Sequence, residues 1–177
     1  VYAFKTAGAA AEKGLDLDAV TAVAHKTASS CRSIGVALSP CAVRQAGKPT
    51  FEIADDEIEM GMGIHGEPGI WRGKLRTADE IATEMMERLL ADMPLSGGDK
   101  VSVMVNSLGA TPPEELYILY NKVKEALEAS GASIVMPLVG RYATSMEMAG
   151  VSFTICKLDD ELESLLKAPC DCAFWRV

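Results

Sequence analysis

Apolar positions recur along the chain in two different periods, which predict helices and strands in alternation. From residue 17 to residue 31 they fall three and four positions apart, as on one face of an amphipathic helix, and Asp16 is suited to cap its start. Residues 100–106 form instead a short valine-rich run, which is typical of a strand. The two patterns together predict helices over 1–12, 17–31, 77–93, 111–130 and 159–167, and strands over 35–38, 57–62, 100–106, 132–138 and 151–158.

Polar residues mark three of the expected helix starts. Thr77 with Glu80, and Thr111 with Glu114, have the spacing of a capping box, in which a hydroxyl and a carboxylate each accept a backbone N–H of the first turn. Asp159 precedes the last predicted helix, and we interpret it as an N-cap rather than as a metal ligand.

The alternation of strands and helices predicts an α/β fold, in which a β-sheet is covered by helices. A loop-like stretch, residues 44–50, follows the first strand and contains Gly47 and Pro49. We place a subdomain boundary there. Residues 1–50 are expected to be the end of a truncated N-terminal subdomain, and residues 51–177 are expected to form a C-terminal α/β subdomain.

The composition narrows the class of protein. The chain has 177 residues, of which 49% are hydrophobic, and a formal net charge of −8. It lacks the clustered Lys and Arg of a surface for nucleic acid or anionic membranes, and no apolar run approaches the roughly 20 residues of a membrane span. No secretory signal and no disulfide-framework spacing of the five cysteines is recognisable, so reduced thiols and a cytoplasmic location are expected. The missing initiator Met indicates a fragment of a longer protein.

The loop Gly-Ile-His-Gly-Glu-Pro-Gly, residues 63–69, is the main candidate for chemistry. Its His65 follows a predicted strand, and ligands of open α/β sheets bind beyond the carboxyl ends of strands. Glycines beside it let a substrate approach the backbone closely. The residues alone leave other interpretations open. These are a structural loop histidine, a zinc site for which only Glu67 is near, a phosphate cradle, and a Ser-His-Asp triad without the usual nucleophile motif.

Three sequence blocks resemble the K family of dihydroxyacetone kinases, which is the substrate-binding subunit or domain. The blocks are residues 60–69 (MGMGIHGEPG), residues 33–40 (SIGVALSP), and residues 144–150 (TSMEMAG) followed by 157–160 (KLDD). Their order and spacing resemble the C-terminal half of that subunit over nearly the whole chain. The resemblance therefore implies the α/β fold of that half, together with the end of the first subdomain.

The resemblance also implies roles for the residues of the loop. In the family, the histidine that matches His65 attacks the ketone of the substrate and holds it as a hemiaminal. Gly63, Gly66 and Glu67 are the expected neighbours that shape the substrate pocket. A neutral imidazole is a competent nucleophile toward a carbonyl carbon. The covalent bond would offset the small apolar area that a short ketose offers for binding.

The expected cofactors and partners follow from the same resemblance. No nucleotide-binding motif is recognisable in this sequence and no metal site is expected, so ATP or ADP with Mg is expected on a separate L domain or subunit. The family's general base belongs to the N-terminal half, which residues 1–50 do not match. We therefore expect the isolated chain not to turn over. A homo-oligomer is also expected, from the resemblance and from the aromatic residues of the tail.

Three functions remain open on the sequence. The first is a kinase for dihydroxyacetone or a related ketose such as erythrulose, with ATP or a phosphotransferase system as phosphoryl donor. The second is a non-catalytic sensor or coactivator paralogue that binds the ketone through His65. The third is a domain that shares only the fold and binds another ligand such as a lipid, against which the intact loop argues. Asn106, in a string that resembles a family motif, is interpreted as a turn or cap residue.

Overall fold

The structure, a computed structural model, describes residues 1–41, 49, 51–64 and 67–177. Within these ranges the helices and strands are, in chain order, α1 (Tyr2–Glu12), α2 (Leu17–Ser29), β1 (Cys31–Ala37), β2 (Glu57–Met60), β3 (Trp71–Lys74), α3 (Ala78–Asp92), β4 (Lys100–Ser107), α4 (Pro113–Ala129), β5 (Ser133–Gly140), β6 (Gly150–Leu158) and α5 (Asp160–Leu166).

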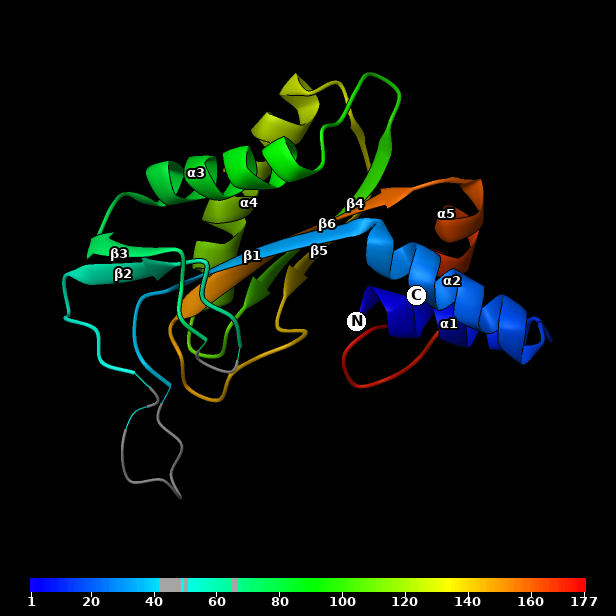
Figure 1. Ribbon diagram of the computed structural model, residues 1–177, viewed down its shortest axis with the longest axis horizontal. Coiled ribbons are helices and arrows are strands. Elements are labelled where there is room, and N and C mark those ends of the chain that lie inside the picture. The colour runs from blue at the N-terminus through cyan, green and yellow to red at the C-terminus, as the bar shows by residue number, and fades with distance from the viewer. Residues whose placement is uncertain (42–48, 50, 65–66) are drawn as a thin grey trace.

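The described strands form one mixed sheet in the order β3-β2-β1-β6-β4-β5 (Figure 1). Strands β4 and β5 run parallel, and every other neighbouring pair is antiparallel. Strand β1 pairs with β6 along its whole length, from Cys31 opposite Cys156 to Ala37 opposite Gly150. The predicted class, an α/β sheet covered by helices, is confirmed. The boundary near residue 50 stays a prediction, and β1 on one side of it pairs with β2 and β6 on the other.

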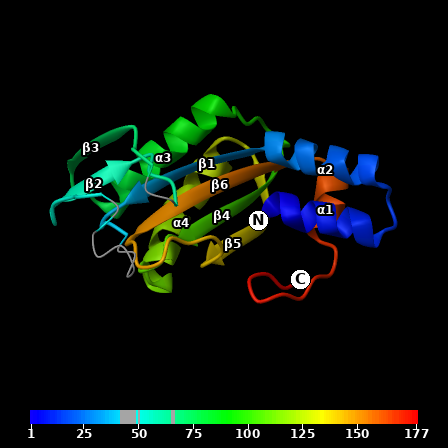
Figure 2. The same ribbon diagram turned by 60° about the horizontal axis from the view of Figure 1, so that its bottom comes forward.

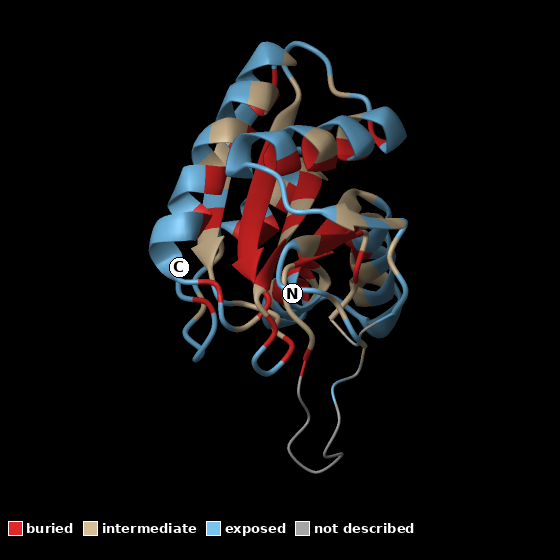
Figure 3. Cartoon of the chain, turned by 90° about the vertical axis from the view of Figure 1, so that its left-hand side faces the viewer, coloured by how far each residue is buried: buried red, intermediate tan, exposed pale blue. Residues whose placement is uncertain are grey.

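Helices α3 and α4 cover one face of the sheet. Alternate residues of the strands face them, and Val101, Val103 and Val105 of β4 are fully buried there. Each fully buried side chain of this size stabilises the fold by about 1.5–3 kcal/mol. Met85 and Met86 of α3 belong to the same apolar layer. The strands are buried beneath helices whose outer surfaces are exposed (Figure 3).

Helices α1, α2 and α5 gather at one end of the opposite face (Figures 1 and 2). Tyr2 of α1 reaches the sheet, where its hydroxyl lies 2.8 Å from Oγ of Ser102, and Ser102 donates to the carbonyl oxygen of Met136 at 2.7 Å. The ring of Tyr2 meets the ring of Trp175 edge to face, with centroids 5.7 Å apart. These contacts involve only one end of the strands. The middle of this face is therefore not covered by the three helices, and it lines a cavity.

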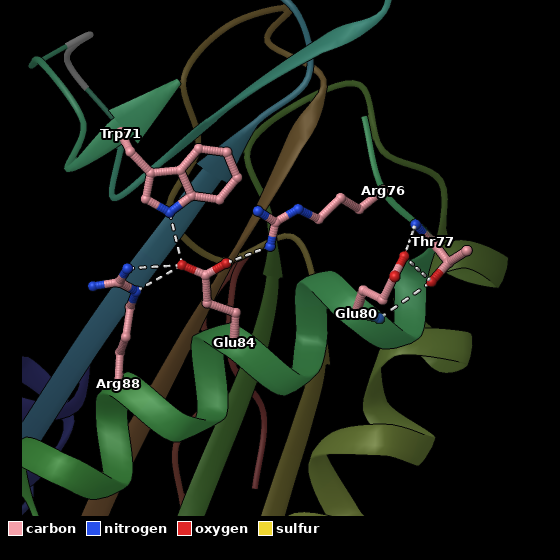
Figure 4. Close-up of polar contacts among 6 residues, drawn as sticks. All are labelled: Trp71, Arg76, Thr77, Glu80, Glu84 and Arg88. Atoms are coloured by element: carbon pink, nitrogen blue, oxygen red, sulfur yellow. Dashed lines mark hydrogen bonds and ion pairs between the residues drawn. The ribbon is translucent and has the colours of Figure 1, made fainter. Parts of the chain in front are cut away.

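The helix caps predicted at Asp16, Thr77 and Asp159 are confirmed. Each aspartate accepts a hydrogen bond from the backbone N–H three residues further on, at 2.9 Å for Asp16 and 2.8 Å for Asp159. Thr77 and Glu80 form a complete capping box at the start of α3 (Figure 4). These local contacts satisfy backbone donors that have no partner inside the helix.

The capping box predicted at Thr111 and Glu114 is wrong. Helix α4 has Pro112 as its N-cap and no side-chain cap hydrogen bond. The Thr111 hydroxyl instead donates to the carbonyl oxygen of Gly150 at 2.7 Å and accepts its N–H at 2.9 Å. Thr111 is buried, so its hydroxyl needs a fixed partner, and the backbone at the start of β6 supplies both halves of that pairing.

The sequence pattern does not predict β3, because residues 71–74 include glycine and two charged residues in a run of four. Contacts with α3 hold this strand (Figure 4). The indole N–H of Trp71 donates to Glu84 at 2.7 Å, and Glu84 also receives hydrogen bonds from Arg76 and Arg88 at 2.8–2.9 Å. The Arg76 guanidinium lies 4.5 Å from the centre of the Trp71 ring, in a cation–π contact.

The junction of α2 and β1 also differs from the prediction. The helix ends at Ser29 rather than at residue 31, and β1 begins at Cys31 rather than at Gly35. The extra strand residues pair with β6 far along the chain, and this tertiary pairing overrides the local helical period. No helix in the described part of the chain is long and apolar enough to cross a membrane.

Candidate functional site

The predicted site residues belong to the loop between β2 and β3, and the structure describes two of the four. His65 and Gly66 lie outside the described residues. Gly63 and Glu67 are brought together: a Cβ atom added to Gly63 would lie 2.4 Å from Oε2 of Glu67. The Glu67 carboxylate therefore packs directly on the Gly63 backbone, and a side chain at position 63 would displace it.

Backbone hydrogen bonds fix both ends of this loop. The N–H of Gly61 donates to the carbonyl oxygen of Gly35 at 2.7 Å, and the N–H of Ile70 donates to that of Met60 at 2.6 Å. Gly61 has φ of +87°, a backbone conformation that favours glycine. The loop therefore leaves and re-enters the β2–β3 hairpin at fixed points.

Glu59, which the sequence interpretation did not identify, holds the far end of the loop. Its carboxylate, 9% exposed, accepts the N–H of Gly69 at 2.8 Å and binds the Arg72 guanidinium. Burial alone would raise the pKa of Glu59, but the hydrogen bond from Gly69 and the bond and charge of Arg72 outweigh it and lower that pKa. Glu59 thus stays ionised as a fixed acceptor at the base of the loop.

An apolar cluster holds the first part of the loop against the sheet. Met62 and Leu108 are buried together with Ala37 and Met148, and Ile64 packs on them. These residues come from the loop, from the ends of β1 and β4, and from the segment before β6. Ile64, which precedes His65 in sequence, is thereby packed against three other parts of the fold.

The loop forms one rim of a cavity on the open face of the sheet. The cavity has a volume of about 640 Å³, and Gly61, Met62, Gly63 and Ile64 are among its lining residues. Its size lies within the range of about 300–1,000 Å³ that is typical of small-molecule pockets. The Gly63 end of the candidate loop therefore faces space that a ligand could occupy.

The floor of the cavity is polar. Oγ of Ser33 and Oγ1 of Thr154 lie 2.7 Å apart, and the Asn106 amide donates to Oγ of Ser152 at 3.0 Å. Hydroxyl groups in the middle of a sheet face are unusual for a surface that packs on an apolar core. This floor offers hydrogen-bonding groups to a hydrophilic ligand or surface.

The interpretation of Asn106 as a turn or cap residue is wrong, because Asn106 belongs to strand β4 and its side chain binds a segment far along the chain. Its amide donates to the carbonyl oxygen of Ala143 at 2.6 Å, and its side-chain oxygen accepts the N–H groups of Tyr142 and Ala143 at 2.8 and 3.0 Å. Asn106 thus holds the segment after β5 at the edge of the cavity. Within the described ranges, no group of three or more His, Cys, Asp or Glu is placed to hold a metal ion.

Solved structures of known proteins share this fold. The dihydroxyacetone kinase operon co-activator Dha-DhaQ matches with a TM-score of 0.88 and 32% sequence identity, over 95% of this chain and 52% of that chain. The dihydroxyacetone kinase from C. freundii, in complex with AMP-PNP and Mg²⁺, matches with a TM-score of 0.83 and 30% identity, over 99% of this chain and 32% of that chain. The fold is therefore that of the dihydroxyacetone kinase class of α/β proteins.

The chain belongs to the Dak1 domain family, whose model matches residues 1–174. It is 48% identical over 174 residues to the Listeria innocua protein named PTS-dependent dihydroxyacetone kinase 2, dihydroxyacetone-binding subunit DhaK, covering 98% of this chain and 53% of that one. It is 42% identical over 177 residues to the L-erythrulose kinase of Pectobacterium atrosepticum, covering 98% and 30%. The resemblance seen in the sequence is confirmed, and the chain spans about half the length of the Listeria relative.

Proposed function

We propose that this chain is the ketone-binding part of a dihydroxyacetone kinase and that His65 holds the ketone as a hemiaminal. The observation that carries the proposal is the GIHGEPG loop, whose ends are fixed by hydrogen bonds and whose Gly63 side lines a cavity with a polar floor. The name of the Listeria relative, a dihydroxyacetone-binding subunit, supports the ligand class.

The proposed chemistry is an addition to the carbonyl group. A neutral imidazole nitrogen of His65 attacks the carbonyl carbon, the carbonyl oxygen takes up a proton, and the other ring nitrogen loses one. Gly63 and Gly66 are proposed to help shape the ketone pocket, and the Glu67 carboxylate, which packs on Gly63, is proposed to accept hydrogen bonds from the hydroxyl groups of the ketone. A polyol without a carbonyl group would not be retained in this way.

The phosphoryl transfer is proposed to need a second protein unit. ATP or ADP with Mg would be held by a nucleotide-binding L domain or subunit in the cytoplasm, and the general base would lie in a part of the subunit beyond this chain. The C. freundii kinase bound to AMP-PNP and Mg²⁺ supports a nucleotide as one possible donor. The chain alone is expected to bind the ketone without turning it over, and to act as a homo-oligomer.

A carbon-13 NMR titration with carbonyl-labelled dihydroxyacetone tests the covalent role of His65. The wild-type chain is expected to convert the ketone resonance to that of a tetrahedral carbon, because addition changes the carbon from three to four substituents. The His65→Ala variant is expected to leave the resonance unchanged.

The matched control is His25→Ala, which removes the other histidine of the chain, an exposed residue of α2. This variant is expected to form the adduct as the wild type does. A tetrahedral resonance that persists in His65→Ala, or one that is absent from the wild type, would contradict the proposal.

A second candidate function, a ketone sensor, is favoured by the high structural similarity to the co-activator Dha-DhaQ. A kinase assay on the subunit with a nucleotide-bearing partner separates the two, since only a kinase would produce the phosphate ester. Offering dihydroxyacetone and L-erythrulose side by side distinguishes the ketoses, in view of the similarity to an L-erythrulose kinase.

A further inference from the structure

Two cysteines that the proposed function does not use lie side by side in the sheet. Cys31 is the first residue of β1, and it lies directly opposite Cys156 of β6 in the antiparallel pairing. Both side chains belong to the face that carries α1, and Cys156 is buried there against Tyr2. Most of the chain lies between the two cysteines in sequence, so only the fold brings them together.

The register puts the two cysteines at a non-hydrogen-bonded position of the ladder. The N–H of Lys157 donates to the carbonyl oxygen of Ser30 at 2.9 Å, and the N–H of Leu38 donates to that of Ala149 at 2.8 Å. Bonded and non-bonded pairs alternate along antiparallel strands, so the Cys31–Cys156 pair between them is non-bonded.

Such a position suits a disulfide bond. Cα atoms of non-hydrogen-bonded pairs are about 4.5 Å apart, with the side chains at their closest. Cα atoms joined by disulfides are about 4.4–6.8 Å apart. The two strands therefore need little movement to let the sulfur atoms bond.

The two thiols differ in exposure and in acidity. Cys31 is half-buried and lines the 640 Å³ cavity, whereas Cys156 is only 1% exposed. A hydrogen bond from the Cys156 thiol lowers the pKa of Cys31, and the Arg32 charge acts in the same direction. The same contact, together with burial, raises the pKa of Cys156. Because the thiolate is the reactive form, Cys31 is the thiol that reacts first.

We propose that Cys31 and Cys156 are a disulfide site, at which a hydroperoxide cross-links β1 to β6. The Cys31 thiolate attacks one oxygen of hydrogen peroxide, giving a sulfenic acid and hydroxide, and the hydroxide takes the proton lost by the thiol. The Cys156 sulfur then attacks the sulfenic sulfur, the S–S bond forms, and the hydroxyl leaves as water with the Cys156 proton. Two thiols and one peroxide thus give one disulfide and two waters, and the peroxide gains the two electrons that the sulfurs lose.

Peptide mapping by mass spectrometry after treatment of the folded chain with hydrogen peroxide tests the proposal. Free thiols are alkylated before digestion. The expected result is a linked peptide that contains Cys31 and Cys156, two fewer alkylated thiols than the five of the reduced chain, and full reversal by dithiothreitol. Alkylation of both Cys31 and Cys156 in the peroxide-treated wild type would overturn the proposal, whatever the variants show.

Variants separate this pair from the other cysteines. Replacement of both Cys170 and Cys172 by serine is the control, and it is expected to leave the linked peptide unchanged. Cys156→Ser is expected to accumulate a sulfenic acid at Cys31, trapped by dimedone, because the second thiol is gone. A linked peptide that disappears in the control, or sulfenic acid that forms at Cys156 in Cys31→Ser as fast as at Cys31 in Cys156→Ser, would contradict the assigned order.

Discussion

Gly63 and Gly69 lie in the same loop but differ in what a side chain would meet. A Cβ atom at Gly69 would lie 2.4 Å from the carbonyl oxygen of Met60, which is fixed in β2. A Cβ atom at Gly63 would meet the end of the Glu67 side chain, which can rotate away. Substitution of Gly69 therefore acts on the fold of the hairpin, whereas substitution of Gly63 acts on the position of Glu67.

We predict that Gly63→Ala weakens ketone binding while leaving stability nearly unchanged. The methyl group displaces the Glu67 carboxylate, and loss of about 1.4 kcal/mol of binding energy corresponds to an affinity about tenfold lower. NMR titration with dihydroxyacetone measures the affinity, and thermal unfolding measures stability. Gly97→Ala is the control, because nothing lies within 4 Å of its added Cβ. An affinity in Gly63→Ala equal to that of the control would refute the role of Glu67.

We predict that Glu59→Gln destabilises the chain at neutral pH and less so in acid. The folded state lowers the Glu59 pKa, so its stabilisation is fully present above the unfolded pKa of about 4.3 and is lost as the pH falls through the folded value. Removing this charged hydrogen-bond acceptor costs about 1–3 kcal/mol near pH 7. Urea unfolding of wild type and variant from pH 7 to pH 3 measures the difference, which should shrink in acid.

Glu57→Gln on the same strand provides the comparison. Its carboxylate accepts one longer hydrogen bond, 3.4 Å from the N–H of Ala54. The loss of stability in Glu57→Gln at neutral pH is expected to be smaller than that in Glu59→Gln, because fewer contacts are lost. A free-energy difference for Glu59→Gln that stays constant down to pH 3 would show that the charge of Glu59 is not responsible.

At the scale of elements, β3 depends on α3. Its Trp71 reaches Glu84, whose carboxylate also holds Arg76 and Arg88 (Figure 4). Burial would raise the pKa of Glu84, but the hydrogen bonds from Trp71 and Arg88 and the nearby positive charges lower it. An ionised carboxylate on the helix thus fixes the strand that follows the candidate loop.

We predict that Glu84→Ala destabilises the chain by about 1–3 kcal/mol and loosens the β2–β3 hairpin before the rest of the sheet. The Trp71 indole loses its acceptor, and two arginines lose a partner. Hydrogen exchange resolved by peptide measures the local effect, with faster exchange expected over 57–60 and 71–74. Glu87→Ala, an exposed change on the same helix, is the control. Equal exchange in both variants would mean that Glu84 does not hold the hairpin.

Local signals allow most elements to be predicted, and their limits explain the errors. Apolar periods and caps such as Asp16 and the Thr77–Glu80 box locate helices, because those contacts are made within one turn. Strand β3 escapes prediction, because it is held by Glu84 and by pairing with β2 rather than by its own residues. Thr111 has the spacing of a cap, but its hydroxyl is bound to Gly150, which no local pattern reveals.

At the scale of the whole molecule, the sequence predicts the class but not the arrangement. Alternating strands and helices indicate a helix-covered sheet, yet the antiparallel pairing of β1 with β6 joins distant segments. The candidate loop was found through its motif, and His65 and Gly66 stay predictions because they lie outside the described residues. The roles of Glu59 and of the polar sheet face depend on that arrangement, so residue patterns alone do not show them.

The place of β6 in the sheet has a consequence for how the chain acquires its structure. Among the described strands, β6 comes last in sequence but lies between β1 and β4. During synthesis, the β1–β2–β3 side and the β4–β5 side have no strand to join them until residues 150–158 have left the ribosome. Their open edges are exposed for that interval, and exposed strand edges favour pairing with other chains. A nascent chain that stalls before this strand is therefore most prone to aggregation, and it depends most on chaperones at that stage.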